Sequence, residues 1–175
     1  MTIIVAQRRG KETWIGADSR MCSGTFLFQQ PVKKWVQVGD WWVGQTGSFR
    51  FDTLLKLQRP VLGGTPEQAA ETLRQMVITD GWEPIHKDEP GVRRHDTQLL
   101  LIAPDGRVFE HGTSGVTIDA NEEFLALGSG CDYALGAAYA LKEENPDYRM
   151  LTAIRAATKY DIACGGTPFL LRLVF

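Results

Sequence analysis

A hydroxyl and an amine can stand on one residue near the start of this 175-residue chain. Thr2 follows Met1, and removal of the methionine would leave Thr2 with its side-chain hydroxyl and a free α-amine. A threonine hydroxyl activated by its own N-terminal amine is a recognised pair of nucleophile and base. An α-amine has an ordinary pKa of about 7.7–8.0, so a large fraction is unprotonated near neutral pH. Thr2 is therefore the first candidate for a reactive residue.

The segment around Thr2 is predicted to be the first strand of a hairpin. Residues 2–9 and 13–18 are rich in β-branched and apolar residues, and a turn signal at residues 10–11 separates them. If the turn is centred there, antiparallel partners have numbers that add up to about 21. That register places Thr2 beside Asp18, so the sequence predicts a carboxylate next to the candidate nucleophile.

The remaining patterns predict strands, two helices, further strands, two more helices and a last strand. Strands are expected at residues 26–28 and 34–38, joined as a second hairpin around Pro31, and at 41–44, 97–102, 107–110, 115–118, 124–127 and 167–175; helices are expected at 49–57, 65–78, 131–142 and 151–162. The charged stretch 82–94, with two prolines, is typical of a surface loop. Separate strand blocks and paired helices favour an α+β fold with two sheets packed face to face.

Length and composition narrow the class of protein. A chain of 175 residues and 19.5 kDa is expected to form one domain. Its 19 basic and 21 acidic residues give a formal charge of −2, which offers no electrostatic footprint for nucleic acid. The apolar runs are too short to span a bilayer, and polar residues occur too early in the chain for a secretory signal. We therefore expect a cytoplasmic protein without a membrane partner. Three cysteines without CxxC spacing indicate neither a disulfide framework nor a zinc site.

Six short motifs follow one another along nearly the whole chain. They are TIIVA with RRG at residues 2–6 and 8–10, IGADSR at 15–20, the lysine pair at 33–34, GQTGS at 44–48, LGSGCDYA at 127–134 and YDIACGG at 160–166. Together they resemble the β-type subunits of the proteasome family, including the bacterial HslV peptidase, among the N-terminal nucleophile hydrolases. The resemblance implies a four-layer αββα sandwich of two antiparallel sheets flanked by helix pairs, with residues 1–175 as a single proteasome-type peptidase domain.

The resemblance assigns three central roles. Mature chains of this family begin at the catalytic threonine, which matches Thr2, and the family's aspartate and lysine fall on Asp18 and Lys34. Each lies 16 positions after the one before (18 − 2 and 34 − 18). The Thr2 hydroxyl would attack a peptide carbonyl and its α-amine would accept the proton. A cationic Lys34, held by Asp18, would lower the pKa values of both groups. Lys33 is expected to point to the opposite face.

Further positions follow from the same resemblance. An oxyanion donor falls on the backbone N–H of Gly47, and Ser129 and Asp161 are placed to orient the amine and its water. Cys164 stands where many relatives have serine, which weakens a supporting hydrogen bond because a thiol is a poor donor. The residues expected to bind the substrate side chain are Met21, Val32 and Thr46.

The resemblance also implies partners. It implies polypeptide substrates, homo-oligomeric rings and no required cofactor, and it leaves room for a structural cation bound by carbonyls of the loop at residues 161–167. The sequence has no GxxxxGK[ST] motif, so an ATP-dependent unfoldase, where one takes part, is a separate chain.

Two other functions stay open at this point. An N-terminal threonine amidase acting on a small molecule would share the nucleophile, with a small assembly and an open pocket. A non-catalytic ring subunit would keep the fold and retain Met1. Intact mass distinguishes the ring subunit from the two enzymes, because loss of the methionine exposes the amine of Thr2.

Overall fold

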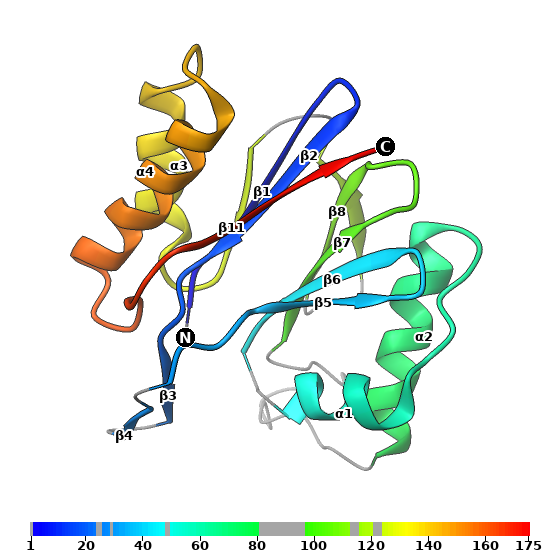
Figure 1. Cartoon of the computed structure of the whole chain (residues 1–175). Coiled ribbons are helices and arrows are strands. Elements are labelled where there is room, and N and C mark those ends of the chain that lie inside the picture. Colours follow the sequence, from blue (N-terminus) through cyan, green and yellow to red (C-terminus); the bar gives the residue numbers. More distant parts are fainter. Residues whose placement is uncertain are drawn as a thin grey trace.

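The computed structural model describes residues 2–23, 26–28, 30–47, 50–80, 97–112, 116–120 and 124–175. Its strands are β1 (Ile4–Arg9), β2 (Glu12–Ala17), β3 (Met21–Ser23), β4 (Phe26–Phe28), β5 (Trp35–Val38), β6 (Trp41–Thr46), β7 (Gln98–Ile102), β8 (Val108–His111), β9 (Thr117–Asp119), β10 (Leu125–Leu127) and β11 (Phe169–Val174). Its helices are α1 (Arg50–Gln58), α2 (Pro66–Thr79), α3 (Cys131–Ala140) and α4 (Pro146–Tyr160). Two sheets lie face to face between the pairs α1/α2 and α3/α4 (Figure 1).

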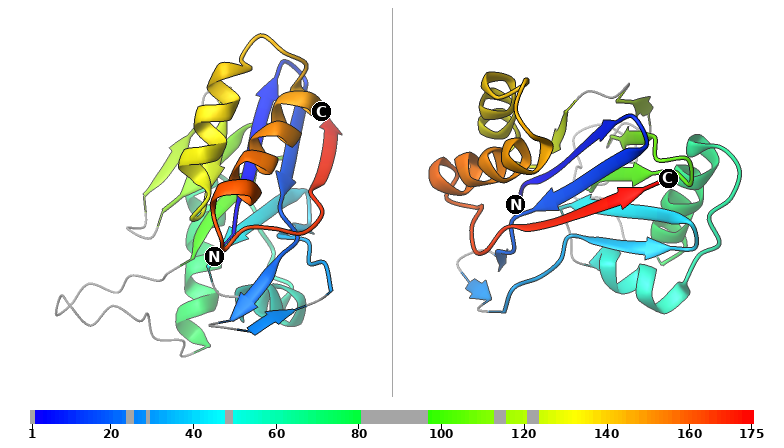
Figure 2. Two further views of the ribbon diagram at one scale, coloured as in Figure 1. Left: turned by 90° about the vertical axis from the view of Figure 1, so that its left-hand side faces the viewer. Right: turned by 45° about the horizontal axis from the view of Figure 1, so that its top comes forward.

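The first sheet is antiparallel, with the strand order β10-β1-β2-β11. The β1–β2 hairpin pairs Ile4 with Ala17 and Arg9 with Glu12, so the numbers of paired residues add up to 21. The predicted register is therefore confirmed. Both views in Figure 2 show this sheet with α3 and α4 on its outer side.

Three hydrophobic clusters fill the spaces between the four layers. Side chains alternate along β1: Ile3 and Val5 pack with α3 and α4, whereas Ile4 and Ala6 pack between the two sheets. The third cluster joins the second sheet to α1 and α2. A strand whose two faces are both apolar is expected for a sheet covered on both sides. The predicted α+β class, with two antiparallel sheets flanked by helix pairs, is confirmed.

The second sheet, with the order β5-β6-β7-β8-β9, corrects one prediction. The hairpin expected between residues 26–28 and 34–38 is wrong, because β4 pairs with β3 and β5 pairs with β6. Two residues separate β3 from β4 in the sequence, which is the length of the shortest common hairpin connection. After Pro31, the N–H of Val32 donates to the carbonyl of Ser19 at 3.1 Å. The chain therefore passes beside the end of β2 before β5 begins.

The helices differ from the predictions mainly at their ends. The fourth helix begins five residues earlier than expected, because the side chain of Asn145 accepts a hydrogen bond from the N–H of Asp147 and Pro146 occupies the first turn. The stretch 82–94, predicted to be a surface loop, lies outside the described residues.

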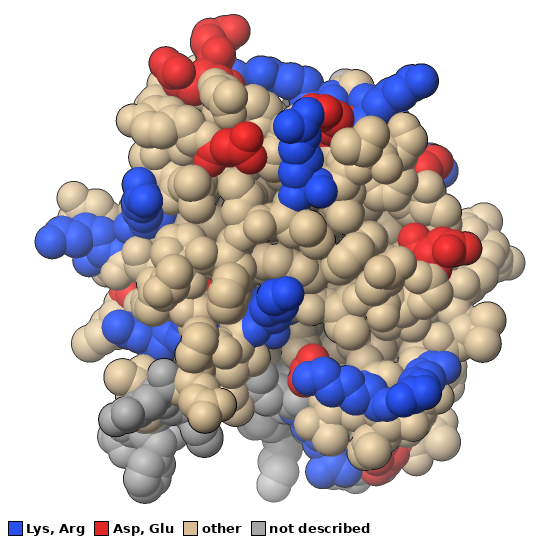
Figure 3. Space-filling view, in the orientation of Figure 1, with Lys and Arg blue, Asp and Glu red and all other residues tan. Residues whose placement is uncertain are grey.

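Charged side chains of both signs are interspersed over the face shown in Figure 3. This distribution agrees with the near-neutral composition and gives that face no extended field of one sign. None of the described helices combines the length and the apolar character that crossing a bilayer would require.

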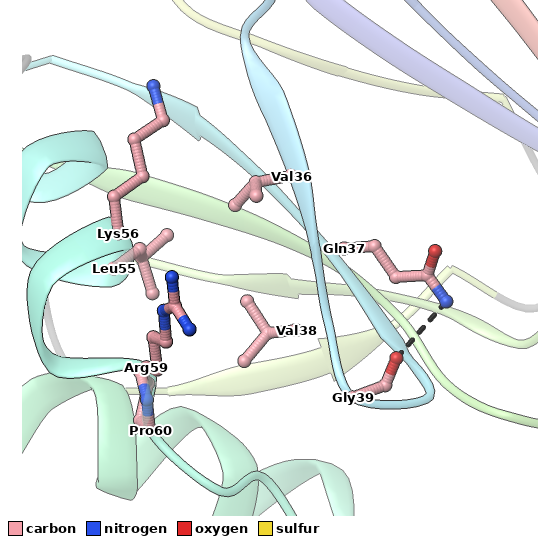
Figure 4. Close-up of a pocket in the computed structure, with 8 residues that line it drawn as sticks. All are labelled: Val36, Gln37, Val38, Gly39, Leu55, Lys56, Arg59 and Pro60. Carbon is pink, nitrogen blue, oxygen red and sulfur yellow. Dashed lines mark hydrogen bonds between the residues drawn. The ribbon is translucent and has the colours of Figure 1, made fainter.

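A groove of about 360 Å³ lies between β5 and α1 (Figure 4). Val36 and Val38 point from β5 toward Leu55 and Arg59, while Gln37 points away and donates to the carbonyl of Gly39 at 3.1 Å. The groove contains none of the residues that the sequence singles out. The candidate site is found instead at the start of β1.

Candidate active site

Thr2 lies two residues before the first residue of β1 and is 3% exposed. The N–H of Asp18 donates to the carbonyl of Ile3 at 3.2 Å, which continues the hairpin ladder by one step beyond its last strand pair. The side chain of Asp18 consequently lies next to Thr2, whose hydroxyl donates a hydrogen bond to Oδ1 of that carboxylate. The hairpin therefore aligns the hydroxyl and the carboxylate.

The carboxylate of Asp18 is completely buried and held at both oxygens. Oδ1 accepts from the N–H of Ile3 at 3.0 Å, and Oδ2 accepts from the N–H of Gly165 at 2.9 Å. The orientation of this carboxylate therefore depends on a residue 147 positions away in the sequence.

Lys34 supplies the opposite charge and is 2% exposed. Its Nζ lies 3.4 Å from Oδ1 of Asp18 and donates to Thr2 Oγ1 at 2.5 Å and to the carbonyl of Arg20 at 2.6 Å. The N–H of Gln45 on β6 donates to the carbonyl of Lys34 at 2.9 Å, which fixes its backbone. Thr2 Oγ1 therefore accepts from an ammonium while it donates to a carboxylate. Lys33, which precedes Lys34 in the sequence, is exposed.

A glycine-rich turn after β10 touches the backbone of Thr2. Gly128 has φ 103°, and a Cβ added there would lie 2.2 Å from the carbonyl oxygen of Thr2 and 3.2 Å from Cγ2 of Thr46. The N–H of Gly130 donates to the same carbonyl oxygen at 3.5 Å. Because an L side chain rarely adopts this φ and no Cβ fits, Gly128 permits the close approach.

We expect Gly128→Ala to destabilise the fold and to displace Thr2. A strained backbone conformation of this kind costs about 1–3 kcal/mol in the free energy of unfolding, and the clash with a backbone oxygen adds to it. Urea unfolding measures the loss. Gly136→Ala is the matched control, because a Cβ at Gly136 in α3 meets nothing within 4 Å and alanine favours a helix. An alanine at position 128 as stable as the wild type would contradict the packing described.

Ser129, between these glycines, belongs to a polar network with Asp161 and Cys164. Burial raises the pKa of Asp161, but a hydrogen bond from the Ser129 side chain, the N–H of Ala163 at 2.9 Å and the Cys164 thiol at 3.2 Å outweigh it and hold that pKa below its usual value. Burial, followed by the negative charge of Asp18, raises the pKa of the Cys164 thiol far above its ordinary value. The network therefore combines an ionised carboxylate with a protonated thiol at neutral pH.

The other predicted residues surround this centre. Gly47 has φ 95° and is exposed directly after β6, and Thr46 is buried with its methyl group facing Gly128. Met21 begins β3 and Val32 precedes Lys34, and both are half-buried. The structure brings Thr2, Asp18 and Lys34 into direct contact. The roles of Gly47 and of the three substrate-binding residues stay predictions.

An open hollow of about 340 Å³ lies next to the site. It is lined by Ser19, Arg20, Leu27, Gln30, Pro31, Gly166 and Thr167. Because Ser19 and Arg20 directly follow Asp18 in the sequence, the hollow lies close to the charged centre.

Three carbonyls of the loop where the resemblance leaves room for a cation accept hydrogen bonds from N–H groups of the chain. The carbonyl of Asp161 accepts from the N–H of Cys164 at 3.0 Å, that of Ile162 accepts from Arg20 Nη1 at 2.8 Å, and that of Gly165 accepts from two backbone N–H groups. Each of these carbonyls therefore has at least one donor within the chain, and the structural cation that the resemblance leaves room for stays a prediction. Among the described residues, no cluster of three or more His, Cys, Asp and Glu side chains could hold a metal ion.

Two positions in the site had no role in the sequence prediction. The N–H of Gly165 donates to the carboxylate of Asp18 and orients it, and the carbonyl of Arg20 accepts a hydrogen bond from Lys34 Nζ. Both lie inside motifs singled out in the sequence, at 160–166 and 15–20. These contacts use backbone atoms, which are the same in every residue type, so the sequence alone does not indicate them.

Comparison with known proteins decides the family. The ATP-dependent protease subunit HslV of Petrotoga mobilis is 30% identical over 144 residues, which cover 80% of this chain and 76% of that protein. The chain belongs to the family of HslV and proteasome β-subunits. HslV of Pseudothermotoga lettingae is 29% identical over 150 residues, covering 80% of this chain and 77% of that protein. Proteasome subunit beta 2 of Ignicoccus hospitalis is 26% identical over 185 residues, covering 94% and 80%. No protein-family model matches the chain.

Solved structures share the fold of this chain. Thiobacillus denitrificans BPH in complex with epoxomicin superposes with a TM-score of 0.81 at 21% identity over 98% of both chains. HslV from Trypanosoma brucei superposes with a TM-score of 0.69 at 18% identity over 99% of both chains. The family consists of N-terminal nucleophile peptidases, so the chain is placed among hydrolases.

Proposed function

We propose that this chain is the threonine-type endopeptidase subunit of a self-compartmentalised ring protease, and that Thr2 is its nucleophile once Met1 is removed. The observation that carries the proposal is the position of Thr2 Oγ1, which donates to the carboxylate of Asp18 and accepts from the ammonium of Lys34 at 2.5 Å. A hydroxyl between two buried charges of opposite sign is poised to lose its proton, because the cation stabilises the developing alkoxide.

The chemistry of the proposal follows from these positions. The hydroxyl oxygen of Thr2 bonds to a peptide carbonyl carbon, and its proton moves to the α-amine of the same residue. The backbone N–H of Gly47 receives the oxyanion, and each donor of this kind contributes about 2.7–4 kcal/mol to transition-state stabilisation. The amine then protonates the leaving nitrogen, and water hydrolyses the ester. Ser129 and Asp161 orient the amine and that water.

The names of the relatives support the assembly. HslV is an ATP-dependent protease subunit and the Ignicoccus protein is a proteasome subunit, so we propose polypeptide substrates and homo-oligomeric rings for this chain. A separate ATP-dependent unfoldase, a cytoplasmic location and chemistry without a required cofactor belong to the same proposal.

Intact-mass spectrometry before and after a threonine-reactive inhibitor tests the proposal. Epoxomicin is the first probe, because it is bound in the Thiobacillus protein of the same fold. We expect a chain lacking Met1 to gain the mass of one inhibitor and to cleave peptides as a high-order assembly. No adduct on a fully processed chain would reject the nucleophile. Retention of Met1 would favour the non-catalytic ring subunit, and a small assembly that cleaves only small amides would favour the amidase.

A further inference from the structure

Arg20 connects two parts of the site through both its side chain and its backbone. Its Nη1 donates to the carbonyl of Ile162 at 2.8 Å, and its backbone N–H donates to the carbonyl of Gly165 at 2.9 Å. Its own carbonyl accepts from Lys34 Nζ at 2.6 Å. One residue thus ties the loop at residues 161–166 to the ammonium that contacts Thr2.

The guanidinium also packs directly on the backbone of this loop. A Cβ added at Gly165 would lie 2.2 Å from Cζ of Arg20 and 2.4 Å from its Nε, so only glycine leaves room for the guanidinium there. The N–H of the same glycine donates to Oδ2 of Asp18 at 2.9 Å. The side chain of Arg20 therefore lies against the peptide unit that orients the buried carboxylate.

We infer that Arg20 is a positioning residue whose guanidinium holds the 161–166 loop against Asp18, in the place where the family resemblance leaves room for a structural cation. The carbonyl of Ile162, which lies in that loop, accepts a hydrogen bond from a permanent positive charge of the chain itself. The guanidinium of Arg20 donates to the carbonyl of Ile162 in the loop, whereas the ammonium of Lys34 is the group that contacts the reacting hydroxyl. Arg20 acts through Gly165 and Asp18, so its loss is expected to affect turnover more than substrate binding.

The test compares Arg20→Ala, Arg20→Lys and the control Arg155→Ala, which changes an exposed arginine of α4. In processed chains, we expect Arg20→Ala to lower kcat of peptide hydrolysis about tenfold with little change in KM, since one hydrogen bond from a charged group is lost. Millimolar guanidinium should restore part of that loss, Arg20→Lys should retain part of the rate, and Arg155→Ala should match the wild type. Removal of divalent cations with EDTA should leave the wild-type rate unchanged.

A second readout does not depend on activity. Backbone hydrogen exchange at the N–H of Gly165 should become about tenfold faster in Arg20→Ala, because the loop that presents it loses one anchor. A variant with wild-type kcat and wild-type exchange would overturn the inference, as would a loss of kcat that neither guanidinium nor lysine relieves. If Arg20→Ala does not fold, the same two measurements are made on Arg20→Lys. A partial loss of kcat and a partly faster exchange would support the positioning role of Arg20, whereas wild-type values of both would overturn it.

The inference rests on the proposed function, but the two can fail separately. A processed wild-type chain without peptidase activity rejects the proposed function whatever Arg20 does. Exchange at Gly165 then still reports whether the guanidinium holds the loop. An active wild type together with an Arg20→Ala variant that matches it in both kcat and exchange at Gly165 rejects only the role of Arg20.

Discussion

Thr2→Ala is expected to reduce peptide hydrolysis by the processed chain at least about 10³-fold, because removing a covalent nucleophile leaves only binding and oxyanion stabilisation. The variant should still fold, since the ion pair between Lys34 and Asp18, 3.4 Å apart, does not involve Thr2. The hydrogen bond lost with the Thr2 hydroxyl contributes about 1 kcal/mol to the free energy of unfolding. Initial rates on a fluorogenic peptide, together with urea unfolding of the same samples, separate the two effects.

Thr2→Ser is the matched control for this experiment. It keeps a hydroxyl and an α-amine on one residue and removes a methyl group, so measurable hydrolysis and inhibitor adduct should remain. Undiminished hydrolysis by Thr2→Ala would reject Thr2 as the nucleophile. The same change with a normal unfolding midpoint and no activity would assign the loss to chemistry.

Lys34→Met should cost both stability and activity. The substitution leaves the carboxylate of Asp18 completely buried without its cation, and breaking a buried ion pair in this way typically costs about 3–5 kcal/mol in the free energy of unfolding. Hydrolysis should fall sharply as well, because no ammonium stabilises the Thr2 oxygen as it loses its proton. Urea unfolding and peptide assays on the purified variant measure the two losses.

Lys33→Met serves as the control for Lys34→Met. Lys33 is the exposed neighbour, so its replacement should change stability by less than about 0.5 kcal/mol and leave hydrolysis unchanged. Equal effects at the two positions would contradict the assignment of Lys34 as the buried partner of Asp18. A Lys34→Met chain that loses activity but no stability would show that the pair contributes little to folding.

Local patterns predicted the hairpin and the layers because strand period and turn residues act over short distances. The turn at residues 10–11 determined the β1–β2 register, which places Asp18 beside Thr2. The pairing of β3 with β4 was missed because both strands have three residues and too short a pattern to choose a partner. The early start of α4 depends on the cap at Asn145, which the apolar period does not reveal.

The supporting contacts of the site lay beyond sequence patterns for a different reason. The bonds from Gly165 to Asp18 and from Lys34 to the carbonyl of Arg20 use main-chain atoms, which every residue carries. Spacing and resemblance indicated which side chains meet, but only the packed layers determine which peptide groups hold them.

The bond between Gly165 and Asp18 has a consequence for the time at which the site forms during synthesis. Asp18 is made early, yet its second oxygen is satisfied only after residue 165 has left the ribosome and packed beside the end of β2. A truncated chain that ends before residue 165 therefore lacks the N–H that fixes the second oxygen of Asp18. Under the proposed function, the site is completed only when nearly the whole polypeptide exists, so such a truncated chain is expected to hydrolyse peptides more slowly than the full chain.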